Sequence, residues 1–124
     1  MSTEQLNWVF NLDDEAQGIA RKLGEGIATR IFPGDQAMLS IVRIAPHSQG
    51  KLHSHPQEQW RVLLEGALVR IQGGQEVAMK AHDFWRTPGD VEHSVRTGDE
   101  GALVLDIFAP PRDEYRKAGE GFDA

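Results

Sequence analysis

The sequence predicts an all-β domain of antiparallel strands that close into a sandwich or barrel. Short apolar or alternating runs follow one another along most of the chain, and Gly, Pro or Asp stands at most of the joins between them. Gly73 and Gly74 form a favourable two-residue hairpin turn. At 124 residues the chain has room for one hydrophobic core and is too short for two. Many short strands around one core are typical of a sandwich or barrel.

Each expected strand is rich in β-branched or aromatic residues, or alternates between apolar and polar ones. In chain order the strands cover residues 26–32, 37–44, 59–64, 67–72, 76–80, 84–87, 93–97 and 102–108. Two other segments favour helix. Asp13 is placed to cap a helix over residues 16–23, which Gly18 weakens, and residues 112–118 follow two prolines as a short helical exit. The charged stretch 112–117 is expected to face solvent.

Composition and charge exclude several classes of function. The chain has no cysteine, which excludes disulfides, iron–sulfur clusters and thiol catalysis. Its net charge is −6 without any basic run, so nucleic acid is not an expected partner, whereas local arginines can still bind small anions. No apolar leader and no apolar run of about 18 residues is present, so we expect neither a signal peptide nor a membrane span, and a cytoplasmic location.

The most informative motif is the pair His53 and His55. Residues two apart on a strand share one face, so both imidazoles can bind one ion, with Gln59 able to supply an oxygen nearby. His93, after a Pro-Gly turn, is a plausible fourth ligand. The alternative is a pair of surface histidines and an ordinary strand amide. We expect one divalent transition metal per chain, and nitrogen and oxygen ligands leave Zn, Ni, Fe, Mn and Cu all open.

A carboxamide ligand at Gln59 would be neutral, so the ion would keep its full double charge. Such an ion polarises a bound carbonyl or enolate oxygen more strongly than one neutralised by a carboxylate. The predicted ligand set therefore favours Lewis-acid chemistry.

The segments around these ligands, roughly residues 50–97, resemble the paired motifs of the cupin superfamily, small barrels that hold one divalent metal among two close histidines, a Glu or Gln, and a third histidine. The resemblance implies a double-stranded β-helix, or jelly roll, in a single domain over residues 1–124. Its barrel would span about 26–110, with an N-terminal extension 1–25 and a C-terminal tail 111–124.

Three positions depart from the common cupin pattern. Gln59 stands where glutamate is usual, and His82 and Asp90 stand where the second motif usually has glycine. The last two departures concern turn geometry and leave the expected ligands unchanged.

An acidic residue, Asp106, interrupts the last apolar run. Burying a carboxylate is costly unless it is paired or hydrogen-bonded. Facing the interior of a barrel that holds a metal, Asp106 would be a candidate acid or base. Alternatively, it caps a turn or neutralises a neighbouring arginine.

Together with the histidine motif, this last strand and its exit resemble a narrower group of small cupins, the KdgF group of pectin-degradation proteins. That resemblance implies a metal-dependent enzyme that opens 4,5-unsaturated uronate sugars into linear keto forms. It implies the following roles: metal ligands His53, His55, Gln59 and His93; catalytic acid/base Asp106; substrate-carboxylate contact Arg112. Arg112 has the alternative of a surface or dimer-interface arginine.

Arg61 is the main departure from that group. It lies two residues after Gln59 and is expected on the same face of its strand. A buried guanidinium needs a partner, either Asp106 or a carboxylate of the substrate. Pairing with Asp106 would weaken the catalytic interpretation, because the aspartate would be held ionised.

The function these features favour is isomerisation or ring opening of a small anionic sugar-derived substrate. Two alternatives stay open: an Fe or Mn dioxygenase-type cupin, and a non-catalytic metabolite-binding module whose metal is structural. A homodimer is expected, because small barrels have sheet edges that a partner commonly covers. The apolar run 6–10 is offered as a strand for that contact.

Overall fold

Antiparallel strands make up most of the computed structural model, which describes residues 8–116 and 119–120. The elements are β1 (Ile19–Gly24), β2 (Ile27–Pro33), β3 (Met38–Ile44), β4 (Glu58–Gln72), β5 (Gln75–Lys80), β6 (Phe84–Thr87), β7 (His93–Arg96), β8 (Ala102–Ala109), the 3-10 helix η1 (Asp113–Arg116) and β9 (Gly119–Glu120). All strand pairs are antiparallel except β1 with β9. The all-β, antiparallel prediction is confirmed.

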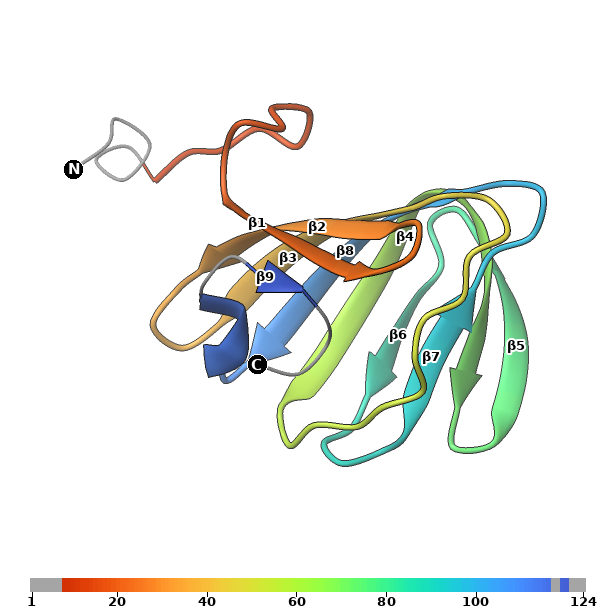
Figure 1. Cartoon of the computed structure of the whole chain (residues 1–124). Coiled ribbons are helices and arrows are strands. Elements are labelled where there is room, and N and C mark those ends of the chain that lie inside the picture. Colours follow the sequence, from red (N-terminus) through yellow and green to blue (C-terminus); the bar gives the residue numbers. More distant parts are fainter. Residues whose placement is uncertain (1–7, 117–118, 121–124) are drawn as a thin grey trace.

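Two sheets share the long strand β4 and fold against each other (Figure 1). The first half of β4 pairs with β6 and β8, and the larger sheet continues through β3, β2, β1 and β9. The second half pairs with β5 and β7. The predicted strands 59–64 and 67–72 are therefore the two halves of one strand.

A turn of the backbone at Gly66 lets β4 take part in both sheets. Its φ is +86°, and a Cβ there would lie 1.9 Å from the carbonyl oxygen of Gly101. Only glycine can occupy this position without moving the neighbouring chain. The register between β4 and β8 shifts just before this point, between Leu63 and Glu65.

Alternating side chains fill the space between the sheets. The apolar core includes Ile31, Leu63, Val104 and Phe108. The interior also carries a polar row, because Ser40, Asp106 and Arg61 are direct cross-strand neighbours on β3, β8 and β4, and all three are buried. Buried polar groups need hydrogen-bond partners. This row therefore restricts how the three strands can pack, and it is also a candidate functional site.

The predicted helix over residues 16–23 is wrong, because residues 19–24 form strand β1. Gly18 takes a φ of +83°, which begins the strand rather than a helical turn. From there Arg21 and Leu23 face the interior, and the strand pairs with β2. A free sheet edge and an alternating pattern outweigh a weak helical preference.

The chain ends behave differently from the expectations. Within the predicted exit over 112–118, residues 113–116 form the 3-10 helix η1, and 117–118 lie outside the described residues. Within the expected solvated face 112–117, Arg112 and Tyr115 are each 2% exposed whereas Asp113 and Arg116 are exposed, so the described part faces solvent only in part, and residue 117 lies outside the described residues. In the expected dimer strand 6–10, residues 6 and 7 lie outside the description, and 8–10 are exposed and form no strand.

His82 and Asp90, the two positions where glycine is usual, both adopt left-handed backbone conformations. Their φ angles are +80° and +68°. Left-handed geometry costs a residue with a Cβ roughly 1–2 kcal/mol relative to its ordinary conformations. Both turns thus keep the left-handed backbone conformation that glycine favours, although the residues there carry side chains.

No helix among residues 8–116 and 119–120 is long and apolar enough to cross a membrane.

Candidate metal centre

Three histidines converge inside the barrel. His93 lies on β7, and the loop before β4 runs beside it, with His53 N donating to His93 O at 3.1 Å and His93 N to His53 O at 2.8 Å. This two-bond bridge fixes His53 opposite His93 and leaves His55, two residues on, facing the same way. One ring nitrogen from each of the three lies within 4.8 Å of the others.

Backbone carbonyls set the tautomer of each ring. The Nδ1 atoms of His53, His55 and His93 lie 2.8, 3.0 and 2.8 Å from the carbonyl oxygens of Lys51, Gln57 and Val91. A carbonyl oxygen only accepts, so each Nδ1 carries the hydrogen and donates it. In the neutral imidazole the Nε2 atom is then an acceptor, which is the form that binds metal, and the Nδ1 bond holds the ring in place.

Burial keeps these rings neutral. It lowers the pKa of His53 to about 4 and that of His93 to about 3, with the neighbouring positive groups adding to the effect. Burial and the Arg112 guanidinium also lower the pKa of His55. At neutral pH the three imidazoles therefore present lone pairs rather than protons.

Gln59 adds a fourth acceptor. Its Oε1 lies 3.0 Å from His55 Nε2, although both atoms are acceptors once His55 Nδ1 donates to Gln57. Among the described residues, His93 Nε2 is buried and meets no hydrogen-bond partner. Lone pairs that converge without a donor between them repel one another, and a cation at their centre removes this repulsion. The residues present thus fit a metal ion with nitrogen and oxygen ligands.

Beside the histidines lies a buried ion pair. Arg61 donates from Nε to Asp106 Oδ1 at 2.5 Å and from Nη2 to Oδ2 at 3.2 Å, and both side chains are almost fully buried. Burial raises the pKa of Asp106, against the opposing effects of Arg61 and of a hydrogen bond from Gln59. The partner of Arg61 in this structure is Asp106, the pairing that weakens a purely catalytic interpretation of the aspartate.

Arg112 is also buried and lines the same cavity. Its Nε donates to Glu114 Oε1 at 2.9 Å, and its guanidinium lies 4.1 Å from the ring centre of Tyr115 and 5.5 Å from that of Phe108. Stacking on two aromatic rings holds the cation rigidly.

The sequence reasoning missed Tyr115, which packs edge-on against Phe108 and whose pKa burial raises to about 12. A second arginine, Arg21 from β1, lies 5.0 Å from its ring centre. A signal was present: Tyr115 follows Arg112 by three residues, which brings both to one side of a helical turn.

The space enclosed by these groups is small. His53, Gln59, Asp106, Arg112 and Tyr115 are among the residues that line a cavity of about 20 Å³. This is room for about one water molecule and far less than the several hundred Å³ of a typical ligand pocket. A sugar would need the lining to move.

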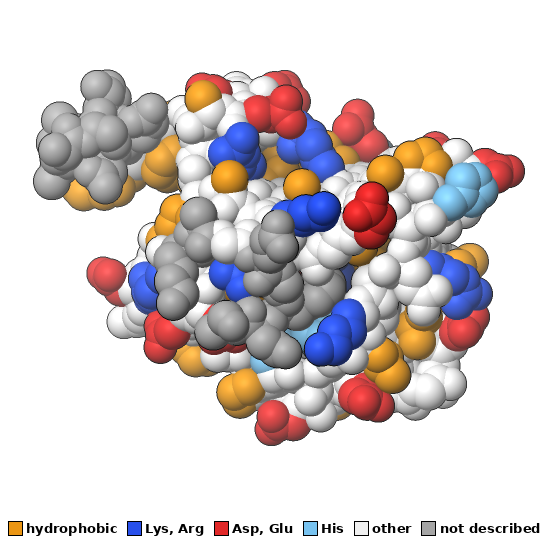
Figure 2. All heavy atoms as spheres, in the orientation of Figure 1, with side chains coloured by type: hydrophobic (Ala, Val, Ile, Leu, Met, Phe, Trp, Pro, Cys, Tyr) orange, Lys and Arg blue, Asp and Glu red, His pale blue; other side chains and the backbone are white. Residues whose placement is uncertain are grey.

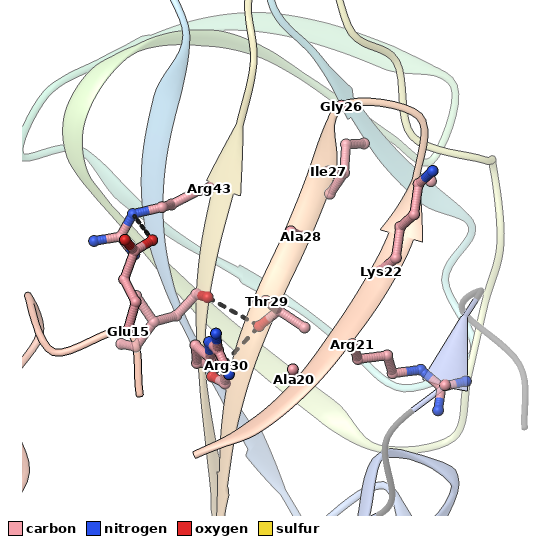
Figure 3. Close-up of a pocket in the computed structure, with 13 residues that line it drawn as sticks. Glu15, Ala20, Arg21, Lys22, Gly26, Ile27, Ala28, Thr29, Arg30 and Arg43 are labelled. Carbon is pink, nitrogen blue, oxygen red and sulfur yellow. Dashed lines mark hydrogen bonds and ion pairs between the residues drawn. The ribbon is translucent and has the colours of Figure 1, made fainter. Parts of the chain in front are cut away.

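A larger hollow of about 620 Å³ lies on the outer face of β1, β2 and β3 (Figure 3). Ala28 is in its floor, and Lys22 and Arg43 flank Ala28 on the neighbouring strands. No histidine lines it, and Glu15 lies 3.6 Å from Arg43. Figure 2 shows acidic and basic side chains interspersed over the face of the molecule that it draws. We therefore place the candidate chemistry in the smaller interior cavity.

Comparisons with known proteins agree with this fold. The chain is 26% identical over 108 residues to the pectin degradation protein KdgF of Dickeya dadantii (strain 3937), covering 86% of this chain and 96% of that protein. Similar solved structures include an RmlC-like cupin from Shewanella frigidimarina NCIMB 400 (TM-score 0.75, 19% identity, 86% of this chain and 96% of that one). Another is KdgF from Halomonas sp. (TM-score 0.72, 20% identity, 85% and 97%). The Cupin domain family matches residues 40–108, more than half of the chain, which therefore belongs to the cupins.

Proposed function

We propose that this cupin is a metal-dependent enzyme that isomerises or opens the ring of a small unsaturated uronate. The observation that carries the proposal is the convergence of three histidine rings on Gln59, where the acceptors His55 Nε2 and Gln59 Oε1 face each other and His93 Nε2 is buried without a hydrogen-bond partner among the described residues, beside a carboxyl group and a buried arginine. The similarity to a protein named for pectin degradation supports an acidic sugar as the substrate class.

Each residue has a proposed role. His53, His55, His93 and Gln59 hold one divalent ion, which when bound acts as a Lewis acid toward an oxygen of the substrate. Arg112, held by its aromatic neighbours, takes the substrate carboxylate in a two-point contact. Asp106 moves the proton between substrate oxygen and carbon. Arg61 neutralises Asp106 and keeps it at the cavity wall.

Substrate entry requires a local rearrangement, because the cavity holds only about 20 Å³. The covering element is the turn η1, which carries Tyr115 into the cavity. Arg116 ties this turn to the β2–β3 loop through Gly34 O at 3.2 Å, and Arg21 binds Glu114 O at 3.0 Å. These contacts, together with the pairing of β9 with β1, would have to open for a substrate to enter.

A second candidate function is supported by the same small cavity. A closed site with four protein ligands is typical of structural metals, and the Arg61–Asp106 pair gives Asp106 a structural partner. The chain would then be a non-catalytic cupin whose metal stabilises the fold and whose binding surface lies elsewhere.

The deciding experiment uses protein stripped with a chelator and reloaded with one metal at a time. Unsaturated uronates absorb in the ultraviolet through their double bond, so enzyme activity is followed as loss of that absorbance, with oxygen consumption recorded in parallel. Turnover that requires metal, without oxygen uptake, supports the proposal. Oxygen uptake would indicate the dioxygenase class, and no turnover with any metal would favour the structural role.

We also propose that the chain forms a homodimer. Several large apolar side chains are exposed on the described surface, including Trp60 at 41% and Phe84 at 65%. Trp60 and Phe84 come from the paired strands β4 and β6. Large apolar side chains that stay exposed on neighbouring strands are candidates for an interaction site.

A further inference from the structure

The carboxamide of Gln59 has one end that binds cations and one that repels them. Its oxygen is an acceptor and its amino group a donor. Oε1 faces His55 Nε2 at 3.0 Å. Without an ion, the reversed amide would suit His55 better, because the amino group would then donate to Nε2. Some other group must hold the amide with its oxygen toward the histidines.

Asp106 is placed to do this. Gln59 on β4 stands opposite Phe108 on β8, and Asp106, two residues before Phe108, lies diagonally across on the same face. Burial raises the pKa of this carboxyl group, and a hydrogen bond from Gln59 acts in the opposite direction, favouring the carboxylate. A carboxylate only accepts, so it attracts the amino end of the amide and repels the oxygen end.

Arg61 holds the carboxylate in turn. It donates to Oδ1 at 2.5 Å and to Oδ2 at 3.2 Å, so both oxygens are engaged by one rigid guanidinium. The same guanidinium lies 5.8 Å from the ring centre of Trp85. Asp106 therefore cannot turn away from Gln59 without breaking a buried ion pair.

We propose that Arg61 and Asp106 are positioning residues that hold the Gln59 carboxamide with its oxygen toward the three histidines, so that a neutral amide completes the cation site. The inference rests on the proposed metal binding. It also gives a physical reason for glutamine at this position, because a carboxylate at residue 59 would lie beside that of Asp106 with no donor between them.

The test measures Zn²⁺ affinity of chelator-stripped protein by competition with a chromophoric chelator. In Asp106→Asn the new amide keeps its oxygen for Arg61 and turns its amino group toward Gln59, which reverses the Gln59 amide. We expect Zn²⁺ affinity to fall about 10–100-fold, the usual effect of losing a residue that orients a ligand. The matched control Asp99→Asn removes an exposed carboxylate that contacts His47, and should stay within about twofold of the parent.

A second pair of variants, Gln59→Glu and the double variant Gln59→Glu/Asp106→Asn, also tests the positioning role. It keeps the inference testable if the single variant Asp106→Asn does not fold. In Gln59→Glu two carboxylates oppose each other. Adding Asp106→Asn supplies an amino group that orients the new Glu, so the double variant should bind Zn²⁺ at least about 10-fold more tightly than Gln59→Glu. A double variant no tighter than Gln59→Glu, or Asp106→Asn with parental affinity, would overturn the inference.

Turnover at saturating Zn²⁺ separates this inference from the proposed reaction. If Asp106→Asn binds Zn²⁺ weakly but recovers turnover at saturation, the positioning role stands and the acid/base role of Asp106 fails. If it binds Zn²⁺ with parental affinity and does not turn over, the acid/base role stands and the positioning role fails.

Discussion

Lowering the pH should destabilise the metal-free protein well above the range in which carboxylates titrate. Burial lowers the pKa of His53 to about 4 and of His93 to about 3, whereas in the unfolded chain both titrate near 6.5. As the pH falls through 6.5, the two histidines bind protons in the unfolded state and stay neutral in the folded state. The stability associated with neutral folded histidines is therefore present above pH 6.5 and is lost as the pH falls toward the folded pKa values.

The magnitude follows from the size of these shifts. Each pH unit between the unfolded and folded pKa costs about 1.4 kcal/mol per histidine. From pH 7 to pH 5 the two groups together would cost roughly 4 kcal/mol, and reducing this by half for partial exposure to solvent leaves about 2 kcal/mol. For a domain of this size that corresponds to a fall in Tm of about 6–10 °C.

The assay is thermal unfolding of chelator-stripped protein from pH 7 to pH 5, followed by circular dichroism. The variant His53→Ala with His93→Ala removes the two histidines used in this calculation and leaves His55, so its Tm should change much less over this range. A Tm of the parent that does not fall between pH 7 and pH 5, or that falls equally in the double variant, would refute the reasoning.

Three further predictions concern the metal, a turn and the surface. Purified protein should hold up to one divalent ion per chain by elemental analysis, and the His53→Ala/His55→Ala variant should lose it; in the parent, chelator should lower Tm, since metal at 100 times Kd adds about 2.7 kcal/mol. Replacing the strained His82 by glycine should raise stability by about 1 kcal/mol, whereas His82→Ala, which keeps the positive φ, should not; equal Tm values for the two variants would contradict the assigned strain. Sedimentation should show a dimer at micromolar concentration that Trp60→Lys weakens, and a monomeric parent would rule the dimer out.

Some of the fold and site could be predicted because the signals are local. Alternation of apolar and polar residues identified most strands, since a strand that is buried on one face must repeat every two residues. The spacing of His53 and His55 predicted that both rings share one face of an extended segment, and in the structure the backbone bridge between His53 and His93 holds the loop beside β7. Gln59 and His93 could be named as candidates from their residue types, but their proximity depends on strand pairing, which only the resemblance to a known motif implied.

Other features depended on contacts between residues distant in sequence. Residues 19–24 became a strand because β2 offers an edge to pair with, which their own preference for helix does not reveal. The burial of Tyr115 depends on η1 folding back over the barrel, so a charged local sequence misled the expectation of a solvated face.

By itself, the sequence determined an all-β chain with a candidate metal motif, since strand periodicity and histidine spacing are encoded within a few residues. Only the tertiary structure decided that Arg61 pairs with Asp106, because β4 and β8 bring together residues 45 positions apart. The orientation of the Gln59 amide follows from the same pairing. Whether its oxygen or its amino group faces the histidines depends on which charged group lies across the barrel, and no local pattern contains that information.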